Sequence, residues 1–166
     1  MNDLSQQLLQ GLAGRVCLLG VGNVDRGDDG FGVRLAEALG KRCEHDIEIV
    51  VAGQTPERCL SRLAEAGFDH VVFLDAVEFG GTAGSVVFLN SAEMAARFPQ
   101  VSTHKLSLGL LARLIEAGGR TRAWLLGVQP GSLAQGTGLT TPVQRSLALL
   151  ADLLVESLFE DSEAPC

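Results

Sequence analysis

Apolar residues gather in five short runs, each bounded by glycine or polar residues, and this pattern predicts five β-strands. The runs occupy residues 15–22, 47–53, 70–77, 84–90 and 123–130. Segments with helical spacing of apolar residues separate most of them. We therefore expect an α/β fold, with a mostly parallel twisted sheet of about five strands and helices on both of its faces.

The fourth run is expected to differ from the others in its direction. Parallel neighbours need a crossover of a dozen or more residues, usually a helix. The link from Phe73 to Val87 is too short for a helical crossover. The sequence thus predicts one antiparallel strand at an edge of the sheet.

Two helices are predicted in the first half of the chain. Apolar positions recur every fourth residue over 31–39 and predict a helix that ends at Gly40. Thr55 is a good N-cap, because its hydroxyl can accept from a backbone N–H and Pro56 would take the first helical position. The helix that these residues begin is expected to end at Gly67.

Two further helices are predicted between the last two strands. Ser91 is expected to cap a short helix that runs through Arg97. A longer helix is expected to begin near His104, after a cap at Ser102 or Thr103. Three leucines at fourfold spacing are predicted to share its apolar face: Leu106, Leu110 and Leu114.

The last predicted helix opens at Thr141-Pro142 and carries a continuous apolar stripe. The stripe consists of Val143, Leu147, Leu150, Leu154 and Leu158. Residues 159–166 are acidic and lack any pattern, so they are predicted to form a flexible tail. Without repeats or a linker, residues 1–166 are expected to form a single domain.

The composition of the chain limits which kinds of partner it can bind. A net charge of -7 argues against nucleic acid and anionic membranes, since both require a basic face. No apolar run approaches the roughly 20 residues that span a bilayer, and the first 15 residues lack the features of a secretory signal. We therefore expect a cytoplasmic protein. No extended apolar stripe is left to face solvent, which favours a monomer.

The four cysteines offer little chemistry. They form no C-x-x-C pair, and Cys17 lies inside an apolar run while Cys59 lies on the apolar side of a predicted helix. We therefore expect small buried side chains rather than a thiolate metal site or a set of disulfides.

A glycine-rich loop, "GVGNVDRGDDGFGV" at residues 20–33, follows the first strand. It does not fit a dinucleotide, because Asp25 stands where G-x-G-x-x-G needs its third glycine. The second strand, 47–53, also ends without the acidic residue that would bind a ribose. Asp28 and Asp29 would repel a pyrophosphate at close range. Carboxylates in such a loop suit a cation instead.

Three side chains are expected to meet at the carboxyl edge of the sheet. Asp29 belongs to the glycine loop, Asp75 ends the third strand in "VVFLDAV", and His104 lies in "VSTHKLSL". Open α/β sheets bind ligands at this edge. Two carboxylates and an imidazole would form a three-ligand site with open positions, suited to nickel, zinc, manganese or iron.

Each of these residues also has a structural alternative. Asp28 and Asp29 could stabilise the positive end of the following helix. Asp75 could cap a turn at the strand end, and a single histidine such as His104 is more often structural than a ligand. If the three side chains never meet, the chain would be a structural α/β domain without a metal site.

Four blocks of sequence together resemble the [NiFe]-hydrogenase maturation endopeptidases. They are "GVGNVDRGDDGFGVRLAEAL", "VVFLDAVEFGGTAG", "STHKLSL" and "LLGVQPGSLAQGTGLTTPV", which span the chain from about Val16 to Glu156 in the order of the family. The resemblance implies a cytoplasmic protease. Its substrate would be the precursor of a hydrogenase large subunit, from which it removes a C-terminal extension after nickel has been inserted.

The resemblance also assigns roles to residues. The nickel-contacting positions of the family fall on Asp29, Asp75 and His104, with nickel carried by the substrate and other divalent ions able to substitute in the isolated protein. The first position is glutamate in some relatives, so Asp29 keeps the charge on a side chain one methylene shorter. A family loop linked to substrate recognition falls on residues 53–55, which are Gly53, Gln54 and Thr55.

Other proteolytic motifs are absent from the sequence. It has no G-x-S-x-G and no H-E-x-x-H. Asp29 and Asp75 could form an aspartic dyad, but the usual D-[ST]-G setting is missing. A nickel-binding chaperone without hydrolytic activity would use the same ligands and is the alternative function. No residue beyond the three ligands is assigned a catalytic role, and the base that would activate water stays unassigned.

Overall fold

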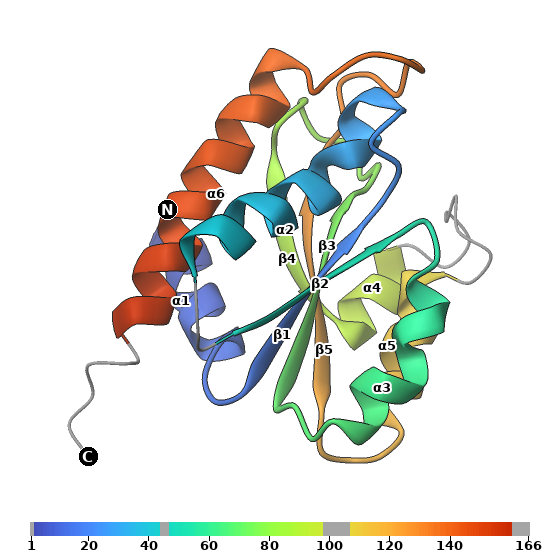
Figure 1. Cartoon of the computed structure of the whole chain (residues 1–166), viewed down its shortest axis with the longest axis vertical. Coiled ribbons are helices and arrows are strands. Elements are labelled where there is room, and N and C mark those ends of the chain that lie inside the picture. The colour runs from blue at the N-terminus through green and yellow to red at the C-terminus, as the bar shows by residue number, and fades with distance from the viewer. Residues whose placement is uncertain (1, 44–46, 98–106, 161–166) are drawn as a thin grey trace.

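A five-stranded sheet forms the centre of the molecule (Figure 1). The computed structural model describes residues 2–43, 47–97 and 107–160. The strands are β1 (Val16–Val21), β2 (Glu48–Gly53), β3 (His70–Ala76), β4 (Val86–Asn90) and β5 (Arg122–Val128). Their order is β2-β1-β3-β5-β4, and only β4 runs antiparallel, beside β5. Both the predicted fold class and the antiparallel edge strand are confirmed.

Two layers of helices cover the sheet. The helices are α1 (Asn2–Gly11), α2 (Phe31–Arg42), α3 (Leu60–Glu65), α4 (Ser91–Arg97), α5 (Leu108–Glu116) and α6 (Thr141–Glu160). Short 3-10 turns, η1 (Gly27–Gly30) and η2 (Pro56–Cys59), precede α2 and α3. In Figure 1, α1, α2 and α6 lie on one side of the sheet and α3, α4 and α5 on the other. No helix in the described part of the chain is long and apolar enough to cross a membrane.

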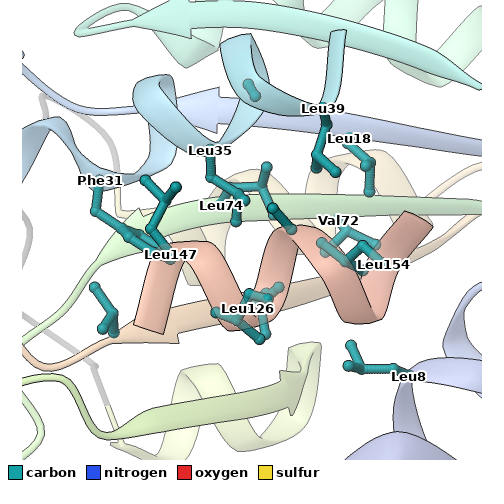
Figure 2. Close-up of a cluster of buried hydrophobic side chains, with 14 of the residues drawn as sticks. Leu8, Leu18, Phe31, Leu35, Leu39, Val72, Leu74, Leu126, Leu147 and Leu154 are labelled. Carbon is teal, nitrogen blue, oxygen red and sulfur yellow. The ribbon is translucent and has the colours of Figure 1, made fainter. Parts of the chain in front are cut away.

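The larger core lies between the sheet and the layer of α1, α2 and α6. Figure 2 shows leucines of α2 and α6, such as Leu35 and Leu147, packed over side chains of the strands, such as Leu74 and Leu126. The predicted stripe of α6 is confirmed: Val143, Leu147, Leu150 and Leu154 are buried, and Leu158 packs against the cluster. The strands therefore read as apolar runs because both of their faces are covered.

Helix α1 was not among the predicted elements. It contributes Leu8 to the larger core, where the side chain is fully buried (Figure 2), and Leu12 follows just after its end. A signal was present, since Leu4, Leu8 and Leu12 repeat every fourth residue. This pattern was weak, because α1 has only ten residues, and glutamines and the exposed Leu9 stand between its regularly spaced leucines.

The predicted helix ends at glycines were only partly right. Helix α2 passes through Gly40 and ends at Arg42, so the predicted end at Gly40 is wrong. Gly40 is exposed and a methyl group on it would meet no atom, so the helix tolerates it there. Helix α3 ends at Glu65, two residues before Gly67, which has a positive φ of 75°.

Two of the predicted caps are also wrong. Thr55 stands at the N-cap position of η2, but its side chain makes no capping hydrogen bond. At α4 the cap is Asn90 rather than Ser91: Asn90 Oδ1 accepts from the N–H of Glu93 at 2.9 Å, and the Glu93 carboxylate accepts from the N–H of Asn90 at 3.4 Å. This reciprocal pair is a capping box. Ser91 is thereby free of the cap, and its hydroxyl donates to Glu116 at 2.6 Å.

Helix α5 differs from its prediction in both its start and its buried face. Ser107 has an extended backbone, and its Oγ accepts from the N–H of Leu110, so α5 begins at Leu108 and not near His104. The predicted apolar face is wrong at both of its described positions, since Leu110 and Leu114 are each 43% exposed, while Leu106 lies outside the described residues. The side chains that α5 buries are Leu108, Leu111, Ala112 and Ile115. Because almost every position of α5 is apolar, spacing alone did not identify the buried face.

Helix α6 includes the beginning of the predicted tail. It extends through Glu160, so residues 159 and 160 are helical, whereas residues 161–166 lie outside the described part of the chain. Residues 98–106, which contain the predicted cap residues Ser102 and Thr103, lie outside it too.

His70 makes the stability of the fold depend on pH. The Trp124 Nε1–H donates to His70 Nδ1 at 3.0 Å. His70 Nδ1 must therefore carry no proton, which requires a neutral imidazole ring. Burial lowers the pKa of His70 below its ordinary value; Asp69 acts to raise it and Arg122 to lower it further. A lowered folded-state pKa means that the contribution to stability is present above about pH 6.5 and is lost as the pH falls through the folded-state pKa.

We expect the free energy of unfolding of the wild type to fall between pH 7.5 and pH 5. In His70→Gln this fall should be smaller, because glutamine can accept the hydrogen bond from Trp124 and does not titrate. Urea unfolding followed by the fluorescence of Trp124, the single tryptophan, measures this. Identical pH profiles for the wild type and His70→Gln would contradict the assignment.

Candidate functional site

The glycine loop turns sharply at Gly22, directly after β1. Its N–H donates to the carbonyl of Gly53 at 2.9 Å, which joins the loop to the end of β2. Gly22 has a φ of 128°, and a Cβ on it would lie 1.9 Å from the carbonyl oxygen of Asp29. Only glycine fits, because the backbone carrying Asp29 folds back against this residue.

Asp29 lies in the 3-10 turn η1, ahead of α2. Its side chain is buried, and its Oδ2 accepts from the N–H of Asn23 at 2.9 Å. The hydrogen bond orients the carboxylate toward the start of the loop. Its position in η1 also lets it interact with the positive end of α2, so the structural alternative for Asp29 remains compatible with this geometry.

Asp75 lies near the end of β3, after four buried apolar residues, and is itself 3% exposed. Its Oδ1 is 3.6 Å from the position that a Cβ on Gly22 would occupy. Asp75 therefore lies beside Gly22, while Asp29 is hydrogen-bonded to the next residue, Asn23. The fold brings two of the three predicted ligands to the same two residues at the carboxyl edge of the sheet.

Asp28, next to Asp29, has a structural role. It is fully buried, and its two oxygens accept hydrogen bonds from Gly131, Ser132 and Thr140 at 2.7–3.1 Å. Burial by itself would raise the pKa of Asp28, but the hydrogen bonds from Thr140, Gly131 and Ser132 hold that pKa below its usual range. The structural alternative for Asp28 is thus supported, with a loop in place of a helix end as its partner.

The third predicted ligand, His104, lies outside the described residues. Within residues 2–43, 47–97 and 107–160, no group of three His, Cys, Asp or Glu side chains could hold a metal ion. The described part of the site therefore supplies two carboxylates, which are the kind of oxygen ligand that divalent ions accept.

The residues predicted to contact substrate follow β2 at the same edge. Gly53 is the residue whose carbonyl accepts from Gly22, and Gln54 after it is exposed. Thr55 is half-buried, and its N–H donates to the carbonyl of Ala52 at 3.3 Å. This loop is thus adjacent to the glycine loop, with Gln54 open to solvent.

One buried polar residue of this edge was not singled out from the sequence. Gln129, which follows β5, is 3% exposed, and its Oε1 accepts from the N–H groups of Phe79 and Gly81 at 2.9 and 3.1 Å. Its Nε2 donates to Glu78 at 2.6 Å. Gln129 therefore holds the loop that follows β3. The only signal in the sequence is its place in the block "LLGVQPG", after an apolar run.

The opposite end of the sheet contains a cavity of about 360 Å³. Its walls include Ser91, Glu116, Thr121 and Trp124. The carboxylate of Glu116 in this cavity is already hydrogen-bonded within the protein: it accepts from the hydroxyl of Ser91 at 2.6 Å and from the N–H of Ala123 at 3.0 Å. The cavity lies at the amino ends of the parallel strands, away from Asp29 and Asp75, and we assign it no role in catalysis.

The cysteines in the described residues do not contribute to the site. Cys17 is fully buried in β1, and its burial, reinforced by the nearby charge of Glu48, raises the pKa of the thiol to about 12. Burial raises the pKa of Cys43 as well. A thiol with a raised pKa is a poor nucleophile, which agrees with the prediction that these residues are structural. Cys43 and Cys59 are only partly buried, so the expectation of full burial holds for Cys17 alone.

Comparisons with known proteins place these features in a family. A family model described as "Hydrogenase maturation protease" matches residues 33–157. The hydrogenase 2 maturation protease of Escherichia coli (strain K12) is 30% identical to this chain over 152 residues, covering 88% of this chain and 92% of that protein.

Solved structures share the fold over almost their whole length. The crystal structure of the [NiFe] hydrogenase maturation protease HycI from Thermococcus kodakarensis KOD1 matches with a TM-score of 0.82 and 32% identity, covering 92% of this chain and 99% of that one. The hydrogenase maturating endopeptidase HybD from E. coli matches with a TM-score of 0.75 and 29% identity, covering 89% and 93%. This chain belongs to the hydrogenase maturation protease family.

Proposed function

We propose that this protein is an endopeptidase that removes the C-terminal extension of a [NiFe]-hydrogenase large-subunit precursor after nickel has been inserted. The observation that carries the proposal is the position of Asp29 and Asp75, whose buried carboxylates lie beside Gly22 and Asn23 at the carboxyl edge of the sheet. Membership of a protease family supports hydrolysis.

The nickel ion is part of the substrate in this proposal. Asp29 and Asp75 would bind it, with His104 as a third ligand, and so hold the scissile peptide beside the glycine loop. The charge of two carboxylates at the same edge of the sheet favours an incoming divalent ion, and a precursor without nickel would lose this interaction. When bound, such an ion supplies a Lewis acid that polarises a carbonyl group or lowers the pKa of a coordinated water.

The neighbouring residues of this chain hold the carboxylates in place. The Asn23 N–H orients Asp29 through its 2.9 Å hydrogen bond. The hydrogen bond from Gly22 to Gly53 keeps the glycine loop beside β2, where the exposed Gln54 is open to the precursor chain. A site fixed in this way before substrate arrives loses little entropy on binding.

Processing of two forms of the precursor tests the proposal. Nickel-loaded large-subunit precursor is expected to lose its C-terminal peptide on incubation with the protein, whereas the nickel-free form is expected to stay intact. Mass spectrometry of the precursor measures both. Equal cleavage of the two forms would contradict recognition of nickel and favour an aspartic dyad of Asp29 and Asp75.

The alternative function, a nickel-binding chaperone, predicts a different nickel content for the isolated protein. A chaperone would hold nickel tightly after purification and release no peptide from the precursor. The endopeptidase is expected to contain little nickel of its own, because the ion arrives with the substrate. Elemental analysis of the purified protein separates the two.

A further inference from the structure

The loop of residues 131–140 has contacts that a surface loop does not usually have. It contains no helix or strand, and Gly131 and residues 133–138 are exposed. Loops of this kind are usually mobile. Here both ends of the loop are held by the same buried carboxylate, Asp28.

The hydrogen bonds of Asp28 close the loop at its base. Oδ2 accepts from the N–H of Gly131 at 2.7 Å, the N–H of Ser132 at 3.1 Å and the hydroxyl of Thr140 at 2.7 Å. Oδ1 accepts from the N–H of Thr140 at 2.7 Å. Hydrogen bonds to an ionised carboxylate are roughly twice as strong as neutral ones. One side chain therefore fixes the first two residues of the loop to its last.

Backbone contacts extend this clamp to the glycine loop. The Asp28 N–H donates to the carbonyl of Ser132 at 2.9 Å, and the Gly136 N–H donates to the carbonyl of Asp25 at 2.7 Å. On its other side, the loop meets the segment after β3, where a Cβ on Gly131 would lie 3.1 Å from that of Ala83. The 131–140 loop thus lies between the glycine loop, which follows β1 and contains Asp29, and the segment that follows β3, the strand that contains Asp75. It is at the top of Figure 1.

The surface of the loop suits contact with another protein. The loop has no charged residue, although the whole chain carries a net charge of -7. Leu133, within the loop, is 36% exposed. Charged residues are depleted at the core of protein interfaces, and this core is more apolar than the rest of a protein surface.

We propose that Asp28 is a positioning residue that, with Thr140, holds the 131–140 loop as a preformed docking surface for the precursor protein beside Asp29 and Asp75. The choice of partner rests on the proposed function. A loop ordered before binding loses less entropy when the precursor arrives, so the clamp should act on KM more than on kcat.

Thr140→Val tests the clamp, because it removes the hydroxyl bond to Asp28 and replaces no residue of the glycine loop. In the wild type, we expect slow hydrogen exchange at the amides of Gly131, Ser132 and Thr140. In Thr140→Val this protection should fall about tenfold, and Thr140→Ser, which keeps the hydroxyl, should restore it. Unchanged exchange in Thr140→Val would overturn the clamp, whatever the protein does to a precursor.

Processing kinetics test the docking surface. With nickel-loaded precursor, Thr140→Val is expected to raise KM about fivefold with a smaller change in kcat, and Thr140→Ser should return KM to the wild-type value. Thr121→Val is the matched control, because it also removes a 2.7 Å hydroxyl bond, to the carbonyl of Phe68, but at the opposite end of the sheet.

Two results would overturn the docking surface while leaving the proposed function intact. One is an unchanged KM in Thr140→Val despite faster exchange of the loop. The other is an equal rise of KM in Thr121→Val, which would mark a general loss of stability. If the wild type cleaves no precursor at all, the proposed function and the docking surface both fail, and hydrogen exchange still decides the clamp.

Discussion

Asp75→Asn is expected to abolish processing of the nickel-loaded precursor, lowering kcat/KM by at least about 100-fold, and to leave the fold intact. Replacing residues that merely support metal ligands already costs about 10–100-fold in affinity or activity, so loss of a ligand charge should cost at least as much. Asparagine has nearly the shape of aspartate and keeps an acceptor oxygen. It loses the negative charge that a divalent ion requires.

The position of Asp75 makes this substitution informative. Its side chain is buried at the end of β3 and lies beside Gly22, next to the residue that binds Asp29. Asp29→Asn and His104→Ala are expected to give the same loss. Mass spectrometry of the released peptide measures activity, and circular dichroism with thermal unfolding verifies the fold.

Asp25→Asn provides the matched control for these variants. Asp25 belongs to the same glycine loop, but it is exposed, and the contact it makes to Gly136 uses its backbone carbonyl. Its variant should process precursor at the wild-type rate. Near-wild-type cleavage by Asp75→Asn would show that the buried carboxylate is not a ligand, and the proposed mechanism would then be wrong.

Gly32→Ala is expected to lower the free energy of unfolding by more than about 3 kcal/mol, or to prevent folding. Gly32 lies in the first turn of α2, where this helix crosses the sheet. A Cβ there would lie 1.8 Å from the carbonyl oxygen of Leu74 and 2.5 Å from that of Val21. Both atoms belong to the backbone of central strands, so neither can move aside as a side chain could.

Gly40→Ala, in the same helix, is the matched control. Gly40 is exposed, and a methyl group on it would meet no atom within 4 Å. Alanine is the better helix former, so this variant should be more stable by about 0.5–1 kcal/mol. Urea unfolding followed by circular dichroism measures both variants. Comparable stabilities for Gly32→Ala and the wild type would show that α2 does not pack so closely on β1 and β3.

The position of α2 also determines the position of the candidate site. Because Gly32 lets the helix rest directly on the backbone of β1 and β3, η1 is held over the ends of these strands, and Asp29 with it. Loss of contact between α2 and the sheet in Gly32→Ala would therefore separate Asp29 from Asp75. Close helix packing and the geometry of the carboxylates have the same structural origin.

The sequence by itself determined the fold class, the strands and the apolar stripe of α6, because burial on both faces leaves continuous apolar runs and one-sided burial leaves a helical period. It also placed Asp75 at a strand end and Asp29 in the glycine loop. The short link before β4 determined its antiparallel direction, since no helical crossover fits.

Only the tertiary structure decided what depends on contacts between distant residues. Asp28 and Asp29 are adjacent and chemically identical, yet Asp28 binds the 131–140 loop while Asp29 lies by Asn23 and Gly22. The buried face of α5 is a similar case, because a helix that is apolar on most sides takes its orientation from the elements that it meets. The local pattern of apolar residues indicates which side chains are buried. Which residues they contact depends on the packing of elements that are distant in the sequence.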